Sequence, residues 1–414
     1  MHLTTLRPSG LSQPVQLFRM MTLSVAMLVL AVTFSSPLHA QTYSDLYNFG
    51  TNVNDPTNPQ VSGVIAQGRD GELYSTTPFG GSNGQGAAFK ISPSGTLNTI
   101  SSFTSSSSGT NPFGGLTLGT DGNLYGTTKT GGSFSFGTLF KLSSSGVLTT
   151  LYDFGTCVYP CNEGTYPISP PIEGADGNYY GTVPNTITGY NHGVVYKLTS
   201  AGKYSTLYAF DGTLGYNPEA PLMQATDGNL YGTTALGGKT VTSCYGSSNT
   251  CGTVFKITTA GKLTTIYQFD QTHGAGPLGP VLQGTDGNFY GTTSAGGTNG
   301  LGVVFKLTSA GVITVLHNFI GSDGETPQAG LIQANDGNFY GVASGGGSLG
   351  FGTIFKMTRG SSGNWSESVV FRFPGTPNEG TAYNGLVSDS AGHFYGATVN
   401  GGTANDGTIY EFIP

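Results

Sequence analysis

The sequence has 414 residues, of which 68 are glycine and only 9% are charged, and its formal net charge is −7. The many aromatic residues exclude a disordered chain, and the scarcity of charged residues excludes a coiled coil or a helical bundle. An acidic chain without a basic cluster is also a poor candidate for binding nucleic acid. We therefore expect an all-β protein that is rich in tight turns.

Residues 1–40 are predicted to be a secretory signal peptide. Arg7 and Arg19 precede an apolar run at 23–34, and Ala40 is a small residue at the expected cleavage point. The run is short for a membrane span, which makes an uncleaved N-terminal anchor the weaker alternative. The mature chain, 41–414, has no stretch long enough to cross a bilayer, and we expect it to be secreted, periplasmic or at the cell surface.

Seven copies of one unit follow the signal peptide. Each copy contains a variant of the segment DGNLYGTT, found at 121–128, and the copies recur every 50 to 59 residues. Repetition at this period is typical of solenoids and propellers. The aligned tyrosines are Tyr74, Tyr125, Tyr180, Tyr231, Tyr290, Tyr340 and Tyr395.

Each copy is predicted to form four short strands. In the second copy these are 115–118, 124–128, 137–142 and 147–154, and an Asp-Gly-Asn turn separates the first two. Asn and Gly accept the backbone conformation of tight hairpins, and the strand residues alternate between two faces. Four strands in about fifty residues match one blade of a β-propeller.

The two ends of the chain complement each other. The seventh copy stops at 408–414, after its third strand, whereas 43–50 resembles an unattached fourth strand such as 148–155. Pairing them closes the ring and removes two exposed sheet edges. We therefore predict a seven-bladed β-propeller, a single domain at 41–414, in which the N-terminal strand completes the last blade.

An aspartate in the first turn and a lysine in the third strand recur together in six copies. In the seventh copy, Ala391 and Glu411 replace them. We predict an Asp–Lys pair within each of the six blades, which fixes geometry more than stability. A Ca²⁺ loop is the weaker alternative, because the turn lacks acidic residues at alternate positions. The predicted pairs are Asp70–Lys90, Asp121–Lys141, Asp176–Lys197, Asp227–Lys256, Asp286–Lys306 and Asp336–Lys356.

Two families of loops vary between the copies: those between the second and third strands, and those that join one blade to the next. Strand alternation places both on one face of the predicted ring, around its channel. The joining loops often carry a proline, which most simply stiffens the entry into the innermost strand. Ordinary loop surface is the alternative to a binding face. The candidate ligand-binding residues are Asn58, Asn111, Tyr166, Tyr190, His192, Tyr216, Asn217, His273, Glu325 and Glu379.

All four cysteines lie in these variable loops. In an exported chain, two local disulfides, Cys157–Cys161 and Cys244–Cys251, are the economical prediction, and exchanged pairing stays open. The spacings are not those of a zinc site, so we predict no metal and no cofactor.

Motifs of known catalytic centres are not found in the sequence. We therefore expect a monomeric, non-catalytic propeller that binds a glycan or a protein through its variable face. The alternative is a polysaccharide lyase or hydrolase with acidic residues, such as Glu325 and Glu379, around the channel.

The repeated unit, with DGNLYGTT at 121–128 and GTVFKIT at 252–258, resembles the bacterial GloVer tandem repeat of exported "choice-of-anchor" proteins. The resemblance covers residues 43–412. It implies an exported protein of the β-propeller type and no particular activity. Members of that group often end in an anchoring segment, and the short end of this chain favours free secretion or periplasmic residence.

Overall fold

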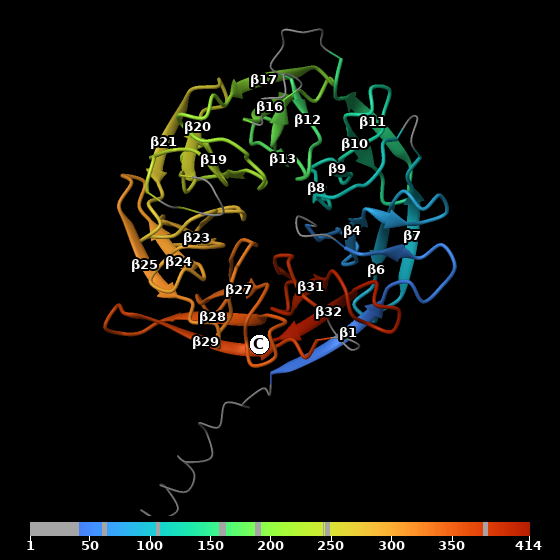
Figure 1. The fold of residues 1–414 in the computed structure, drawn as a ribbon. Helices are drawn as coiled ribbons and strands as arrows, with labels where there is room; N and C mark the ends of the chain where they lie inside the picture. Colours follow the sequence, from blue (N-terminus) through green and yellow to red (C-terminus); the bar gives the residue numbers. More distant parts are fainter. Residues whose placement is uncertain are drawn as a thin grey trace, which may run out of the picture. The chain divides into compact units, whose positions relative to one another are not determined.

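The computed structural model describes residues 41–59, 64–104, 108–156, 163–186, 192–242, 244, 249–375 and 380–414. Within the compact unit Thr42–Pro414, seven four-stranded antiparallel sheets form a ring (Figure 1). This confirms the predicted seven-bladed β-propeller. The predicted signal peptide lies outside the described residues. The described residues form strands, turns and loops, and none of them forms a helix with the length and apolarity needed to cross a membrane.

The sheets are numbered along the chain as blades 1 to 7, and each is given from its innermost to its outermost strand. Blade 1 consists of β3 (Ala66–Gln67), β4 (Leu73–Thr77), β6 (Ala87–Ile91) and β7 (Leu97–Ser102), and blade 2 of β8 (Thr117–Leu118), β9 (Leu124–Thr128), β10 (Thr138–Leu142) and β11 (Leu148–Asp153). Blade 3 consists of β13 (Ile172–Glu173), β14 (Tyr179–Val183), β16 (Val194–Leu198) and β17 (Tyr204–Ala209). Blade 4 consists of β18 (Met223–Gln224), β19 (Leu230–Thr234), β20 (Thr253–Ile257) and β21 (Leu263–Gln268). Blade 5 consists of β22 (Leu282–Gln283), β23 (Phe289–Thr293), β24 (Val303–Leu307) and β25 (Ile313–Asn318). Blade 6 consists of β26 (Ile332–Gln333), β27 (Phe339–Ala343), β28 (Thr353–Arg359) and β29 (Trp365–Arg372). Blade 7 consists of β30 (Val387–Ser388), β31 (Phe394–Thr398), β32 (Thr408–Ile413) and β1 (Thr42–Asn48).

The core lies between neighbouring blades. All five residues of β9 are buried, and β10 is buried except at its lysine, because both strands are covered by sheets on either side. Phe103 of blade 1 meets Phe140 of blade 2 edge-on, with ring centroids 5.1 Å apart. The recurring aromatic residues thus pack one blade against the next, and such rings supply large hydrophobic gains.

The N-terminal strand closes the ring as predicted. Strand β1 runs antiparallel to β32, with a register from Thr42 opposite Ile413 to Asn48 opposite Thr408 (Figure 1). The ring of Tyr43 stacks on that of Phe371 in blade 6, at a centroid distance of 3.9 Å. The last blade is therefore built from both ends of the unit.

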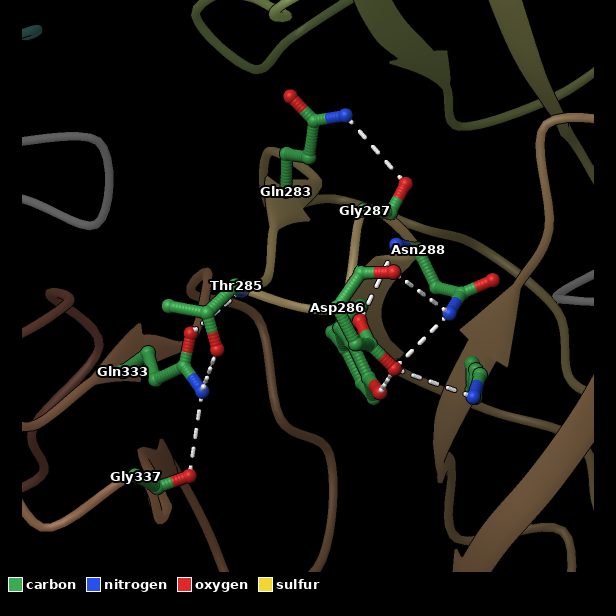
Figure 2. Close-up of polar contacts among 9 residues, drawn as sticks. Gln283, Thr285, Asp286, Gly287, Asn288, Gln333 and Gly337 are labelled. Atoms are coloured by element: carbon green, nitrogen blue, oxygen red, sulfur yellow. Dashed lines mark hydrogen bonds and ion pairs between the residues drawn. The ribbon is translucent and has the colours of Figure 1, made fainter.

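The Asp-Gly-Asn turn is organised by its aspartate, as Figure 2 shows for blade 5. One carboxylate oxygen of Asp286 accepts the backbone N–H of Asn288 at 3.1 Å. The other accepts the hydroxyl of Tyr290 at 2.8 Å and the Nζ of Lys306 at 3.2 Å. Equivalent tyrosine-to-aspartate bonds of 2.7–3.2 Å are present in blades 1 to 6. The tyrosine hydroxyl is thus the constant partner of the aspartate.

The predicted set of six Asp–Lys pairs is only half correct. Three pairs form, whereas Lys90 of blade 1 binds Glu72 at 2.6 Å instead of Asp70. Among the described ion pairs, none joins the aspartate to the lysine in blades 2 and 4. The lysine side chain is long enough to reach another acceptor, and the aspartate already accepts a hydrogen bond from the tyrosine hydroxyl. The pairs formed are Asp176–Lys197 at 3.3 Å, Asp286–Lys306 at 3.2 Å and Asp336–Lys356 at 3.0 Å.

Blade 7 replaces the missing aspartate with one from an earlier position. The Oδ2 atom of Asp389, two residues before Ala391, accepts the hydroxyl of Tyr395 at 3.1 Å. The Nδ1 atom of His393 lies 2.9 Å from Oε1 of Glu411, which also contacts Tyr395. Sequence alignment alone hides this substitution, because Asp389 aligns with a glycine or an alanine in the other copies.

Glutamine side chains join the turns of neighbouring blades. The Oε1 atom of Gln333 in blade 6 accepts the backbone N–H of Thr285 in blade 5 at 3.0 Å, and its Nε2 donates to Gly337 at 3.2 Å (Figure 2). Gln283 likewise accepts the N–H of Thr226 in blade 4 at 2.8 Å. These bonds hold the blades in register around the Asp-Gly-Asn face.

We expect Asp286→Asn to reduce the dependence of stability on acid pH. Burial alone would raise the pKa of Asp286, but the bonds from Tyr290, Asn288 and Lys306 outweigh it and lower the pKa to about 2. The ionised group therefore stabilises the fold above its ordinary value of 3.8, and this contribution is lost as pH falls through about 2. The variant should unfold more easily at pH 7, by about 1 kcal/mol.

Urea titrations of Asp286→Asn between pH 2 and pH 7 are the measurement. Since asparagine still accepts the N–H of residue 288, the turn should persist. An unchanged acid slope would contradict this assignment.

Candidate binding site at the central channel

The two variable loop families lie together on one face of the ring. The loop entering blade 1 pairs with the loop between its second and third strands, through β2 (Pro56–Thr57) and β5 (Phe79–Gly80). The same arrangement recurs in blade 3, where β12 (Gly164–Thr165) pairs with β15 (Asn185–Thr186). We call this surface the loop face.

The residue before each joining-loop proline has a structural role that the sequence interpretation missed. Asn111 donates its backbone N–H to Gln85 of blade 1 at 3.0 Å and accepts that of Lys129 of blade 2 at 2.9 Å, so it links two blades. Its side chain also donates to the carbonyl of Pro78 at 2.9 Å. Five of these residues share a φ of +53° to +62°, which asparagine tolerates better than most: Asn58, Asn111, Tyr166, Asn217 and Thr326.

A cavity of about 350 Å³ occupies the channel at the centre of the ring. The innermost strands of all seven blades and the segments leading into them line it. Its polar lining consists of few side chains, including Thr117, Glu219 and Gln328. Its apolar lining includes Ile65, Leu222, Met223, Leu278, Val281, Leu282, Leu331, Ile332, Leu386 and Val387.

Glu219 is the one carboxylate among the described residues that line the cavity. Burial raises its pKa, against the opposing effects of the hydrogen bond from Asn217 and the positive charge of Lys129. The Nδ2 atom of Asn217 donates to Oε1 of Glu219 at 2.6 Å. The ammonium group of Lys129 lies 4.7 Å from the ring centroid of Phe113. A half-buried carboxylate thus borders an apolar channel.

Glu219 could have been recognised as a candidate by comparing the copies position by position. It follows Asn217-Pro218, at a position held by Phe113, Ile168, Leu278 and Gln328 in other copies. It is the only acidic residue among these, and this position borders the channel in blades 4, 5 and 6.

The structure brings three of the predicted site residues together next to Glu219. The rings of His192 and Tyr216 are 5.6 Å apart, and the backbone N–H of Asn217 donates to the carbonyl of His192 at 3.1 Å. This group, together with Glu219, lies where the loops of blades 3 and 4 meet.

The other predicted site residues are separate from this group. Tyr166 lies edge-on to Phe136, with centroids 5.5 Å apart, and Nδ1 of His273 lies 2.9 Å from Asp270. Glu325 pairs with Gly345 through its backbone N–H, at 2.8 Å. Asn58 and Asn111 bridge blades at other junctions, and their side chains bind backbone carbonyls. Tyr190 and Glu379 lie outside the described residues.

One of the two predicted disulfides is present. Cys244 and Cys251 are bonded, with their Cα atoms 5.4 Å apart, and both are buried in the core between blades 4 and 5. This bridge closes the enlarged loop of blade 4. Cys157 and Cys161 lie outside the described residues.

The fold and its repeats define a tandem-repeat β-propeller. The chain matches the Gloeobacter/Verrucomicrobia repeat over residues 21–245 and 240–414, and it belongs to this family. No curated protein matches it.

Two solved structures illustrate the likeness of fold. A gluconolactonase from Xanthomonas campestris is 12% identical, with a TM-score of 0.46, and the match covers 91% of this chain and 90% of that one. A provisionally assigned 6-phosphogluconolactonase from Bacteroides uniformis is 14% identical, with a TM-score of 0.48, over 78% of this chain and 88% of that one.

Proposed function

We propose that this propeller is an exported, non-catalytic binding protein that receives a peptide segment of a protein partner at the loop-face mouth of its channel. The observation that carries the proposal is the apolar lining of the central cavity, bordered by the carboxylate of Glu219. The segment places an apolar side chain in the channel and a basic side chain against Glu219.

The composition of the lining favours a peptide over a glycan. Sugar hydroxyls that enter an apolar channel lose their water without gaining hydrogen bonds, which costs free energy for each group. An apolar side chain instead gains from leaving water. Among the described lining residues, moreover, Glu219 has no second carboxylate beside it, whereas sugar hydrolysis of the common type uses two.

Glu219 supplies the specificity in this proposal. Asn217 donates one hydrogen bond to Glu219, and a carboxylate can accept several, so a ligand cation can bind as well. Burial raises the pKa of Glu219. The positive charge of a basic ligand beside it would lower that pKa again and so favour the ionised carboxylate.

Export is part of the proposal. The buried Cys244–Cys251 disulfide supports it, because disulfides persist in oxidising compartments. We propose cleavage near Ala40 and a mature chain that acts as a monomer in the periplasm or outside the cell.

We expect Leu278→Trp to weaken peptide binding by filling the channel mouth. Peptide and glycan arrays identify the ligand class, and fluorescence anisotropy then compares the wild type with the variant. Binding of apolar–basic peptides should weaken by about tenfold or more, the cost of losing one well-packed apolar side chain.

Val312→Trp is the matched control for Leu278→Trp, since Val312 is 62% exposed in an outer turn. It should leave peptide affinity unchanged. Binding to glycans alone, or equal peptide affinity in both variants, would overturn the proposed function.

A further inference from the structure

The outer strands of neighbouring blades meet through a repeated contact. A residue opposite the end of the third strand lies against an aromatic residue of the preceding blade. Tyr204 of blade 3 stacks on Tyr152 of blade 2 at 4.2 Å. Tyr43 of blade 7 stacks on Phe371 of blade 6 at 3.9 Å. This outer contact is thus a stacked pair of aromatic rings at these two junctions.

The junction of blades 5 and 6 departs from that rule. Glu367 lies opposite Met357, the register position of Tyr204 and Tyr43, and His317 has the position of Tyr152. Two side chains that can carry a charge near neutral pH therefore occupy the positions where these two junctions have aromatic rings. Such a replacement is costly in free energy unless the groups gain a partner.

Asp323 completes a cluster of three at this junction. Its Oδ2 lies 2.9 Å from Nε2 of His317, and its Oδ1 accepts the backbone N–H of Ile320 at 2.9 Å. One nitrogen or oxygen atom from each of His317, Asp323 and Glu367 lies within 4.8 Å of the other two. The side chains of His317 and Asp323 are only 19% and 11% exposed.

Glu367 is the member of the cluster with an unsatisfied buried oxygen atom among the described residues. Its Oε1 is buried and has no hydrogen-bond partner among the residues that the structure describes. Burial raises its pKa to about 7, repulsion from Asp323 adds to this, and Arg372 opposes it. A positive charge between the three side chains would satisfy the oxygen and cancel the repulsion.

We propose that His317, Asp323 and Glu367 bind a divalent transition-metal ion, Zn²⁺ being the best-suited probe. One imidazole nitrogen with two carboxylate oxygens is a ligand set that such ions accept, with a remaining position for water. Calcium fits less well, because it needs six or more oxygen ligands. The ion would cross-link the outer strands of blades 5 and 6, β25 and β29, through His317 and Glu367.

Isothermal titration of the untagged, disulfide-intact protein with Zn²⁺ tests the proposal. We expect one ion per chain and a rise in melting temperature. Glu367→Gln keeps the shape of the side chain but removes its charge, and it should weaken binding by about tenfold or more. Glu367→Ile installs the residue that blade 5 has at this register, Ile313, and should fold stably without binding the ion.

His273→Ala is the matched control, because His273 pairs with a single carboxylate, Asp270, and belongs to no cluster of three among the described residues. It should bind Zn²⁺ like the wild type. The proposal is wrong if the wild-type protein binds no stoichiometric Zn²⁺, or if Glu367→Gln and Glu367→Ile bind it as tightly as the wild type does.

Discussion

A chain that begins at Asn52, and therefore lacks β1 and Phe49, is expected to lose its stable monomeric fold. The truncation removes every partner of β32 on its outer side, from Thr42 to Asn48. It also removes Phe49, which is fully buried and bonded through its backbone N–H to Gly407 at 3.0 Å. Losing Phe49 alone would cost about 3–5 kcal/mol, of the order of the whole stability of many domains.

The exposed edge of β32 gives this prediction a second consequence. An unpaired strand edge is a template for association between chains, so the truncated protein should aggregate or form larger species. Size-exclusion chromatography and thermal melts of chains starting at Gln41 and at Asn52 are the measurement.

A synthetic peptide with the sequence of 41–51 is the control for this truncation. Added in excess, it should restore a monomer that melts cooperatively. An equal melting temperature for both chains, without peptide, would show that closure by β1 contributes nothing to stability.

The ring was predictable because closure leaves its mark in the sequence. The orphan strand at 43–50 and the truncated last copy could each be seen without coordinates, and local cysteine spacing sufficed for Cys244–Cys251. These features depend on residues that are close in sequence or repeated at one period, and either kind of signal can be read along a chain.

Contacts between blades were not predictable in the same way. Gln333 binds Thr285, a residue 48 positions away, and nothing in either copy alone points to the other. The equivalence of Glu367 to Ile313 of blade 5 could not be recognised in the sequence. Strands β28 and β29 of blade 6 are longer than their counterparts, so the two copies differ in the number of residues before this position. The candidate site at Glu219 depends on the residue after the joining-loop proline bordering the channel in blades 4, 5 and 6, and only the geometry of the ring decides that.

The second large effect is expected from Gly302→Ala at the start of β24. Gly302 has a φ of +100°, and its equivalent in blade 6, Gly352, has a φ of +101°. A Cβ at Gly302 would lie 2.3 Å from the carbonyl oxygen of Thr293 and 2.8 Å from Cδ of Pro327. The carbonyl of Thr293 cannot move away without disturbing the pairing of β23 with β24, and the ring of Pro327 cannot move away without separating blades 5 and 6.

The proline of each joining loop therefore packs against a glycine of the preceding blade, which gives the repeated Pro a function beyond stiffening the loop. The same arrangement recurs in the first two blades, where a Cβ at Gly86 would lie 2.5 Å from Cδ of Pro112. We expect Gly302→Ala to lower the free energy of unfolding by about 2–5 kcal/mol, from backbone strain and overpacking together.

Gly300→Ala is the matched control, two residues away in the same loop. Gly300 also has a positive φ, +77°, but a Cβ there meets nothing within 4 Å. It should therefore cost only the backbone strain, about 1–2 kcal/mol. Urea denaturation of both variants separates backbone strain from overpacking, because the strain is common to them and the contacts with Thr293 and Pro327 are made only at Gly302. Equal destabilisation by the two substitutions would mean that the proline–glycine contact does not hold the blades together.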